Sequence, residues 1–276
     1  MTTMRDKLQT LLARLRFDVL AAALDKELER AEREATPAPE LIYRLLCAEA
    51  ASQRQRSLAY RLKQARLPWD WTLETFPFDA QPNLNRGQIK TLAGLDFLSR
   101  ANNIVLTGKT GTGKTGIAIG ILREACLNGY RGRFYDAQDL LDELYASLAD
   151  RSTSRLLKRL SRLQPLIIDK VDNLNVKPEQ ANAFFRLIDQ RYNRVSTIIT
   201  TSLELDDWYE LFAKKDLVDA LLDRLRHRCI TINIDGASLR SPEAASAQAG
   251  QKRSPRSSRQ QSRRRAVEGE RAGAQS

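Results

Sequence analysis

Eight consecutive residues, 108–115, have the types and spacing of a loop that holds phosphate groups. They fit the pattern G-x-x-x-x-G-K-S/T, in which glycines let successive backbone N–H groups curl around phosphate oxygens. The lysine of such a loop reaches the β- and γ-phosphates, and the hydroxyl that follows it ligates Mg²⁺. The sequence therefore predicts ATP or GTP binding, with Mg²⁺, by Gly108, Lys109, Thr110, Gly111, Thr112, Gly113, Lys114 and Thr115.

The segments on both sides of this loop are those that a phosphate loop requires. The apolar run at 103–107 predicts a buried strand, and the apolar residues from Gly116 onward predict a helix that reaches about Asn128. A helix that begins at the loop directs the positive end of its dipole at the bound phosphates. A loop that matched the pattern by coincidence would have no reason to lie between these two elements.

A carboxylate for the metal is predicted at Asp169, which ends the apolar run Leu166-Ile-Ile. Ligands of open α/β sheets bind at the carboxyl ends of the strands, where this side chain would lie. A buried acid without a cation or a hydrogen-bond partner would be unfavourable, which argues against a purely structural role. We therefore expect Asp169 and Thr115 to hold Mg²⁺.

Apolar strands and amphipathic helices alternate from residue 86 to residue 236, which is typical of a parallel sheet with helices on both faces. The predicted fold class is thus α/β, preceded by a small all-helical domain. Predicted strands are 103–107, 132–135, 165–169, 197–201 and 229–234, and predicted helices of this core are 86–99, 114–128, 137–148, 151–163, 178–192 and 216–226.

The N-terminal part predicts two helices, at 4–35 and 40–66. The second helix is basic, which fits either the solvated face of an ordinary helix or a surface that contacts DNA. We expect residues 1–66 to form a helical domain that binds DNA or a protein partner, and residues 67–85 to form an aromatic linker. The basic side chains of the second helix are Arg44, Arg54, Arg56, Arg61, Lys63 and Arg66.

The net charge of +11 favours a polyanionic partner, with nucleic acid first. Residues 237–276 contain nine Lys or Arg and three Asp or Glu, without apolar periodicity, and predict a disordered basic tail. No apolar run approaches the length of a membrane span. Cys47, Cys126 and Cys229 show no disulfide or metal-binding spacing, which favours a cytoplasmic protein without a membrane partner.

The chain to about residue 236 resembles the IstB-like ATPases that serve transposases, relatives of the DnaC-like helicase loaders in the AAA+ class. The resemblance implies an AAA+ core, a helical DNA-binding domain, and homo-oligomers on DNA with ATP between subunits. It also implies that Arg224 is an arginine finger, although a surface salt bridge is the alternative. The resemblance rests on Arg66-Leu-Pro-Trp, Thr72-Leu-Glu-Thr-Phe-Pro-Phe, Arg86-x-Gln-Ile, Leu95-Asp-Phe-Leu-x-Arg, the phosphate loop, Leu166-Ile-Ile-Asp, Phe184-Phe-x-Leu-Ile, Arg191-Tyr, Ser196-Thr-Ile-Ile-Thr and Leu221-Leu-Asp-Arg-Leu.

Three sites depart from the pattern of this family, and one of them is Lys109-Thr110 in the phosphate loop, where the family prefers small residues or proline. Lys170 stands where the family has the glutamate that orients the attacking water, and a cation cannot accept a proton from it. Asp172 is a candidate replacement, and Thr201-Ser202 stands where the family has an asparagine that contacts the nucleotide. We therefore expect ATP to bind, with Ser202 among the contacts, while hydrolysis is slow.

The resemblance implies an ATP-dependent, DNA-binding regulator of transposition that oligomerises on duplex target DNA and recruits or stimulates a transposase. The alternative is a DnaC-like loader of a replicative helicase, because a basic helical domain can bind proteins as readily as DNA. A nucleotide-gated scaffold without useful turnover is a third hypothesis, and it overlaps the first.

Overall fold

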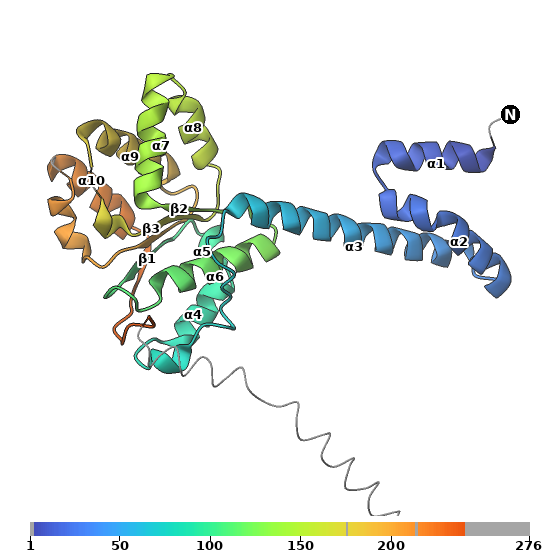
Figure 1. Ribbon diagram of the computed structural model, residues 1–276, viewed down its shortest axis with the longest axis horizontal. Helices are drawn as coiled ribbons and strands as arrows, with labels where there is room; N and C mark the ends of the chain where they lie inside the picture. Colours follow the sequence, from blue (N-terminus) through green and yellow to red (C-terminus); the bar gives the residue numbers. More distant parts are fainter. Residues whose placement is uncertain (1–2, 175, 213–214, 241–276) are drawn as a thin grey trace, which may run out of the picture.

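Short apolar strands form one parallel sheet at the centre of the core (Figure 1). Their order is β2-β3-β4-β1-β5, and every neighbouring pair is parallel. The computed structural model describes residues 3–174, 176–212 and 215–240. The strands are β1 (Asn103–Thr107), β2 (Arg133–Asp136), β3 (Leu166–Asp169), β4 (Thr197–Thr200) and β5 (Cys229–Asn233).

Helices cover both faces of the sheet, because alternate residues of each strand point to opposite sides. Ile167 and Ile198 belong to the core beneath α4–α6, whereas Ile168 and Ile199 belong to the core beneath α7–α10. The expected α/β fold is therefore confirmed. The helices are α4 (Arg86–Ala93), α5 (Asp96–Ser99), α6 (Lys114–Leu127), α7 (Ala137–Ala149), α8 (Thr153–Leu160), α9 (Pro178–Arg191) and α10 (Lys215–Arg226), with 3-10 turns η1 (Phe78–Ala80), η2 (Val171–Asn173) and η3 (Leu205–Glu210).

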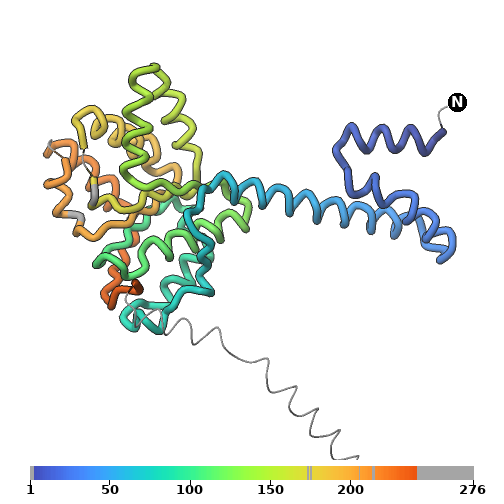
Figure 2. Tube along the Cα trace, in the orientation of Figure 1, coloured from blue at the N-terminus to red at the C-terminus, as the bar shows by residue number. Residues whose placement is uncertain are grey.

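Three further helices precede the core: α1 (Met4–Leu15), α2 (Asp18–Glu34) and α3 (Ala38–Ala65). The C-terminal part of α3 packs on α6 and β2, and Arg61 Nε donates a hydrogen bond to the carbonyl oxygen of Cys126 at 2.8 Å. The rest of α3 projects away from the core and carries α1 and α2 at its outer end (Figures 1 and 2).

The prediction of one helix over residues 4–35 was wrong. The chain turns between α1 and α2 at Arg16, which has the left-handed φ of 58°. The turn lets Leu12 of α1 pack with Leu20 and Leu24 of α2 and Leu45 of α3. Burial of these leucines requires α1 to fold back, which a single straight helix could not do.

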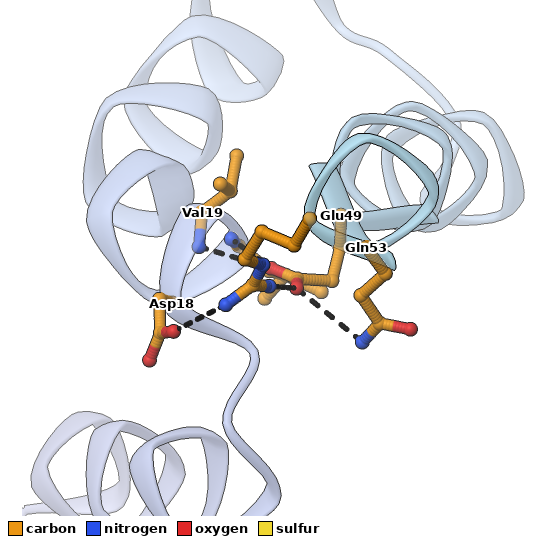
Figure 3. Close-up of polar contacts among 6 residues, drawn as sticks. Asp18, Val19, Glu49 and Gln53 are labelled. Carbon is orange, nitrogen blue, oxygen red and sulfur yellow. Dashed lines mark hydrogen bonds and ion pairs between the residues drawn. The ribbon is translucent and has the colours of Figure 1, made fainter. Parts of the chain in front are cut away.

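A buried acid of α3 caps the N-terminus of α2 (Figure 3). Phe17, the residue before α2, provides no side-chain cap. Glu49 Oε2 instead accepts hydrogen bonds from the backbone N–H groups of Val19 at 2.9 Å and Leu20 at 3.1 Å. Its Oε1 lies 2.8 Å from Arg56 Nη2, so the carboxylate is paired as well as hydrogen-bonded. Glu49 therefore joins α2 to α3 at two otherwise unsatisfied donors.

We expect Glu49→Ala to lower the free energy of unfolding by about 2 kcal/mol, because two helix-terminal N–H groups lose their acceptor and Arg56 loses one of its two carboxylate partners. Urea unfolding, followed by circular dichroism, measures the change. Glu40→Ala is the matched control, since Glu40 is an exposed acid of α3 that pairs with Arg44. Equal midpoints for the two variants would show that the Glu49 contacts do not stabilise this region.

No helix within residues 3–174, 176–212 and 215–240 is long and apolar enough to cross a membrane. Of the predicted basic tail, only residues 237–240 belong to the described part of the chain. The prediction for residues 241–276 lies outside it.

Candidate nucleotide-binding site

The predicted phosphate loop joins β1 to α6 at the carboxyl edge of the sheet. Gly108 has φ 132°, and a Cβ at this position would lie 2.3 Å from the carbonyl oxygen of Ile234. Gly113 precedes α6 with φ 101°, and a Cβ there would lie 2.7 Å from the Phe76 ring. Both positions combine a left-handed conformation with close packing, which only glycine accommodates. The result is a tightly turned loop at the start of a helix, an arrangement that binds anions.

Lys114, the first residue of α6, turns back over this loop. Its Nζ donates hydrogen bonds to the carbonyl oxygens of Gly108 at 2.5 Å and Lys109 at 2.9 Å. Burial lowers the pKa of Lys114, and the nearby carboxylates of Asp172 and Asp169 act in the opposite direction. A partly desolvated ammonium group gains most from a nearby anion, and a phosphate group would supply one.

Asp169 accepts hydrogen bonds from two hydroxyl groups. Its Oδ1 accepts hydrogen bonds from Thr115 Oγ1 at 2.8 Å and from Thr200 Oγ1 at 2.6 Å. Burial raises the pKa of Asp169, and the two hydrogen bonds oppose this change. Thr115 and Asp169 thus present two oxygen ligands side by side. This pair suits Mg²⁺, which takes one or two protein oxygens and completes its shell with water and phosphate oxygens.

Lys170 lies next to Asp169 but is directed toward Asp136 at the end of β2. Its Nζ lies 3.0 Å from Asp136 Oδ2, and this hydrogen-bonded pair raises the pKa of Lys170. Its backbone has φ 61° and donates a hydrogen bond to Thr200 Oγ1 at 2.9 Å. Lys170 is therefore held as a cation in the wall of the pocket, and it has no capacity to accept a proton from water.

Asp172 and Ser202 contact each other. Ser202 donates from its backbone N–H to Asp172 Oδ1 at 3.1 Å and from its hydroxyl to Oδ2 at 2.6 Å. Asp172 lines the pocket described below, whereas Ser202, the predicted nucleotide contact, touches Asp172 but is not among the lining residues. Besides Thr115, the residue whose hydroxyl reaches Asp169 is Thr200, which sequence analysis did not single out. Thr200 ends β4, the neighbour of β3, so the argument from strand ends could have found it.

A pocket opens over the phosphate loop, and its wall includes residues far apart in the sequence. Trp71 of the linker covers the first turn of α6, where a Cβ on Gly116 would lie 2.2 Å from the indole ring. The lining residues are Trp69, Trp71, Thr110, Gly111, Gly113, Lys114, Thr115, Gly116, Lys170, Asp172, Thr200, Leu239 and Arg240.

Arg224 does not line this pocket of its own chain. Its guanidinium lies 2.9 Å from Asp189 Oδ1, and Nη1 donates to the carbonyl oxygen of Ala220 at 2.8 Å. This is the surface salt bridge that sequence analysis gave as the alternative. A finger role requires a second subunit and stays a prediction.

Comparison with known proteins decides the family. Residues 10–247 match the family described as IstB-like ATP binding protein. The chain belongs to this family. It is 38% identical to an insertion sequence IS21 putative ATP-binding protein of Pseudomonas aeruginosa, over 86% of this chain and 89% of that protein. It is 32% identical to the corresponding IS5376 protein of Geobacillus stearothermophilus, over 87% of this chain and 96% of that protein.

Solved structures share the fold of this IstB-like chain. The crystal structure of the DnaC helicase loader superimposes with a TM-score of 0.52 at 23% identity, over 62% of this chain and 99% of that chain. AMPPCP-bound DnaA from Aquifex aeolicus gives 0.51 at 24% identity, over 61% of this chain and 51% of that chain. These likenesses show that the core has the fold of these two proteins, in agreement with the α/β core predicted from the sequence.

Proposed function

We propose that this protein is an ATP-dependent regulator of DNA transposition that oligomerises on duplex target DNA and recruits or stimulates a transposase. The observation that carries the proposal is a phosphate loop with Lys114 and a Thr115–Asp169 oxygen pair, in a chain 38% identical to an insertion-sequence ATP-binding protein. An insertion sequence moves through its transposase, so an ATP-binding protein of such an element has a transposase as its natural partner.

The shape of the chain supports a DNA-binding role for the N-terminal helices. Two of the basic side chains predicted on α3 form ion pairs within the chain: Arg44 pairs with Glu40, and Arg56 pairs with Glu49. Arg54 and Lys63 are exposed and form no ion pair with any described residue. Arg54 lies in the middle of α3 and Lys63 near the end of α3 that rests on the core, and phosphate groups of a duplex could reach both exposed side chains.

ATP is proposed to lie between subunits of the oligomer. Arg224 is partly exposed. Once its ion pair with Asp189 is broken, its guanidinium would reach the terminal phosphate of the ATP bound to a neighbouring subunit. Asp172 would serve as the replacement carboxylate only after releasing Ser202. Both roles require a rearrangement of the contacts described above, which fits a protein that acts as an assembly.

Size-exclusion chromatography with DNA tests the proposal. With ATP and Mg²⁺, we expect large complexes on duplex DNA and smaller or no complexes without nucleotide. Single-stranded DNA of the same length and charge per strand is the control. A preference for single strands, or assembly that ignores nucleotide, would contradict the proposal; the first result would favour a helicase loader, the function of the DnaC protein whose fold this chain shares.

A further inference from the structure

Five short segments lead into the five strands of the sheet, at the edge opposite the phosphate loop. Because neighbouring strands are parallel, these segments lie side by side. The backbone N–H of Gln164 donates a hydrogen bond to the carbonyl oxygen of Arg131 at 2.9 Å, and that of Asn103 donates to Arg228 at 2.7 Å. In the order of the strands β2-β3-β4-β1-β5, the segments are 128–132, 161–165, 192–196, 100–102 and 227–228.

Each of these segments contains one arginine, and none contains Asp or Glu. All five arginines are exposed, and none forms an ion pair with any residue that the structure describes. One guanidinium group donates a hydrogen bond within the described ranges, from Arg228 Nη1 to the carbonyl oxygen of Arg100 at 3.3 Å. The five residues, which we call the arginine row, are Arg131, Arg162, Arg194, Arg100 and Arg228.

The row also follows the C-terminal ends of helices α6, α8, α9, α5 and α10. A helix dipole favours a cation at such an end, which accounts for the sign of these charges. It leaves most of the guanidinium N–H groups without acceptors, whereas Arg159 and Arg226 of the same helices pair with Glu143 and Asp206. Unpaired cations placed side by side repel one another unless a polyanion lies along them.

The spacing of the row fits the phosphates of a DNA strand. Neighbouring strands of a sheet lie about 4.8 Å apart, so five strands span about 19 Å. One strand of a duplex has a phosphate about every 3.4 Å along the axis, which gives about five or six phosphates over that length. A row of five cations thus faces a similar number of phosphates.

Helix α3 leaves the core beside one end of the row. Arg61 of α3 donates to the carbonyl oxygen of Cys126 at 2.8 Å, close to the C-terminal end of α6, and the segment that contains Arg131 follows α6. The exposed Arg54 lies about two helical turns further out on α3. A duplex that lies along the row therefore continues toward the projecting helix of Figure 1.

We propose that the arginine row binds the phosphate backbone of duplex DNA. The proposal rests on the DNA binding of the proposed function and adds to α3 a contact surface on the α/β core. Contacts to phosphates position a duplex without distinguishing its sequence. Because the row and the phosphate loop lie at opposite edges of the sheet, one subunit holds DNA and nucleotide at the same time.

Fluorescence anisotropy of a labelled duplex, with the full chain, ATPγS and Mg²⁺ at several NaCl concentrations, tests this surface. We expect the triple variant Arg131→Gln, Arg162→Gln, Arg194→Gln to flatten the slope of log affinity against log salt by about 2.7 for each subunit bound, since each lost phosphate contact removes about 0.9. Lysine at the same three positions should keep the wild-type slope, because counterion release depends on charge. The affinity of the glutamine variant for ATPγS should equal that of the wild type.

The matched control removes three exposed cations that lie outside the row, from α4, α8 and α9. It is the triple variant Lys90→Gln, Arg155→Gln, Arg186→Gln, which lowers the net charge by the same amount. Its slope should stay near that of the wild type.

Two results would overturn the proposal. Equal flattening in both triple variants would show that only net charge matters. An unchanged slope in the row variant would leave the arginines to helix-end stabilisation, if only the melting temperature falls, or to an acidic protein partner. A wild-type chain that binds no duplex at any salt concentration would instead reject the DNA binding of the proposed function, so the two failures are distinguishable.

Discussion

Lys114→Ala is expected to lower the affinity for ATP by about a hundredfold, as expected for the loss of charge-assisted hydrogen bonds to two phosphate groups. The fold already places this ammonium group over the phosphate loop, where it contacts the carbonyl oxygens of Gly108 and Lys109. Its partial burial strengthens the attraction to an anion. Because assembly is proposed to require ATP, the same variant should form no large complexes on duplex DNA.

Titration with ATPγS and size exclusion with duplex DNA measure the two effects of Lys114→Ala. Thermal unfolding shows whether the variant keeps its fold. We expect that it does, because burial disfavours the charged form of Lys114 and its removal relieves that cost. Lys90→Ala is a suitable control, because Lys90 is an exposed lysine of α4 outside the pocket. ATP affinity within a few-fold of the wild type would contradict the proposed site.

Lys170→Glu is expected to raise the rate of ATP hydrolysis by at least about tenfold, because general-base assistance is worth about 100-fold or more when the base is well placed. Lys170 now holds a positive charge next to Asp169, and it pairs with Asp136. A glutamate there would be repelled by Asp136, which raises the pKa of the new carboxyl and favours its turning toward the pocket. The wild-type rate should be low.

Phosphate release at saturating ATP measures this effect. Lys170→Ala is the control that removes the cation without supplying a base, and its rate should stay near that of the wild type. A substantial wild-type rate that Asp172→Ala abolishes would contradict the reading of Lys170 and identify Asp172 as the working carboxylate. That outcome would require Asp172 to leave Ser202, its partner at 2.6 Å.

The sheet was predictable because its strands are buried on both faces and read as apolar runs. The predicted strand 165–169 corresponds to β3 (Leu166–Asp169), and the phosphate loop fixed β1 and α6. Breaks inside helical patterns were not predictable: the predicted helix 86–99 divides at Leu95, which has a left-handed φ of 65°. A non-glycine residue in that conformation leaves no local signal, because tertiary packing stabilises it.

The residues of the candidate site that lie within one sequence motif could be predicted. Contacts between residues far apart in the sequence were harder to predict. The loop and the Thr115–Asp169 pair followed from a local pattern and one strand end. The Lys170–Asp136 pair and the position of Arg240 depend on long-range contacts. Arg240 lies in a basic segment that sequence analysis interpreted as a tail, and only its hydrogen-bonded approach to Gly111 associates it with the pocket.

The length of α3 has a mechanical consequence. Its 28 residues span about 42 Å at the helical rise, and only its C-terminal part rests on the core, beside α6. If α3 tilted by about 10° about its C-terminal end, its N-terminal end would move by about 7 Å. A displacement of that size is enough to make or break contacts with a DNA backbone. Small movements of the helix that begins at the phosphate loop would therefore be amplified into large ones at α1 and α2, as with the long arm of a lever.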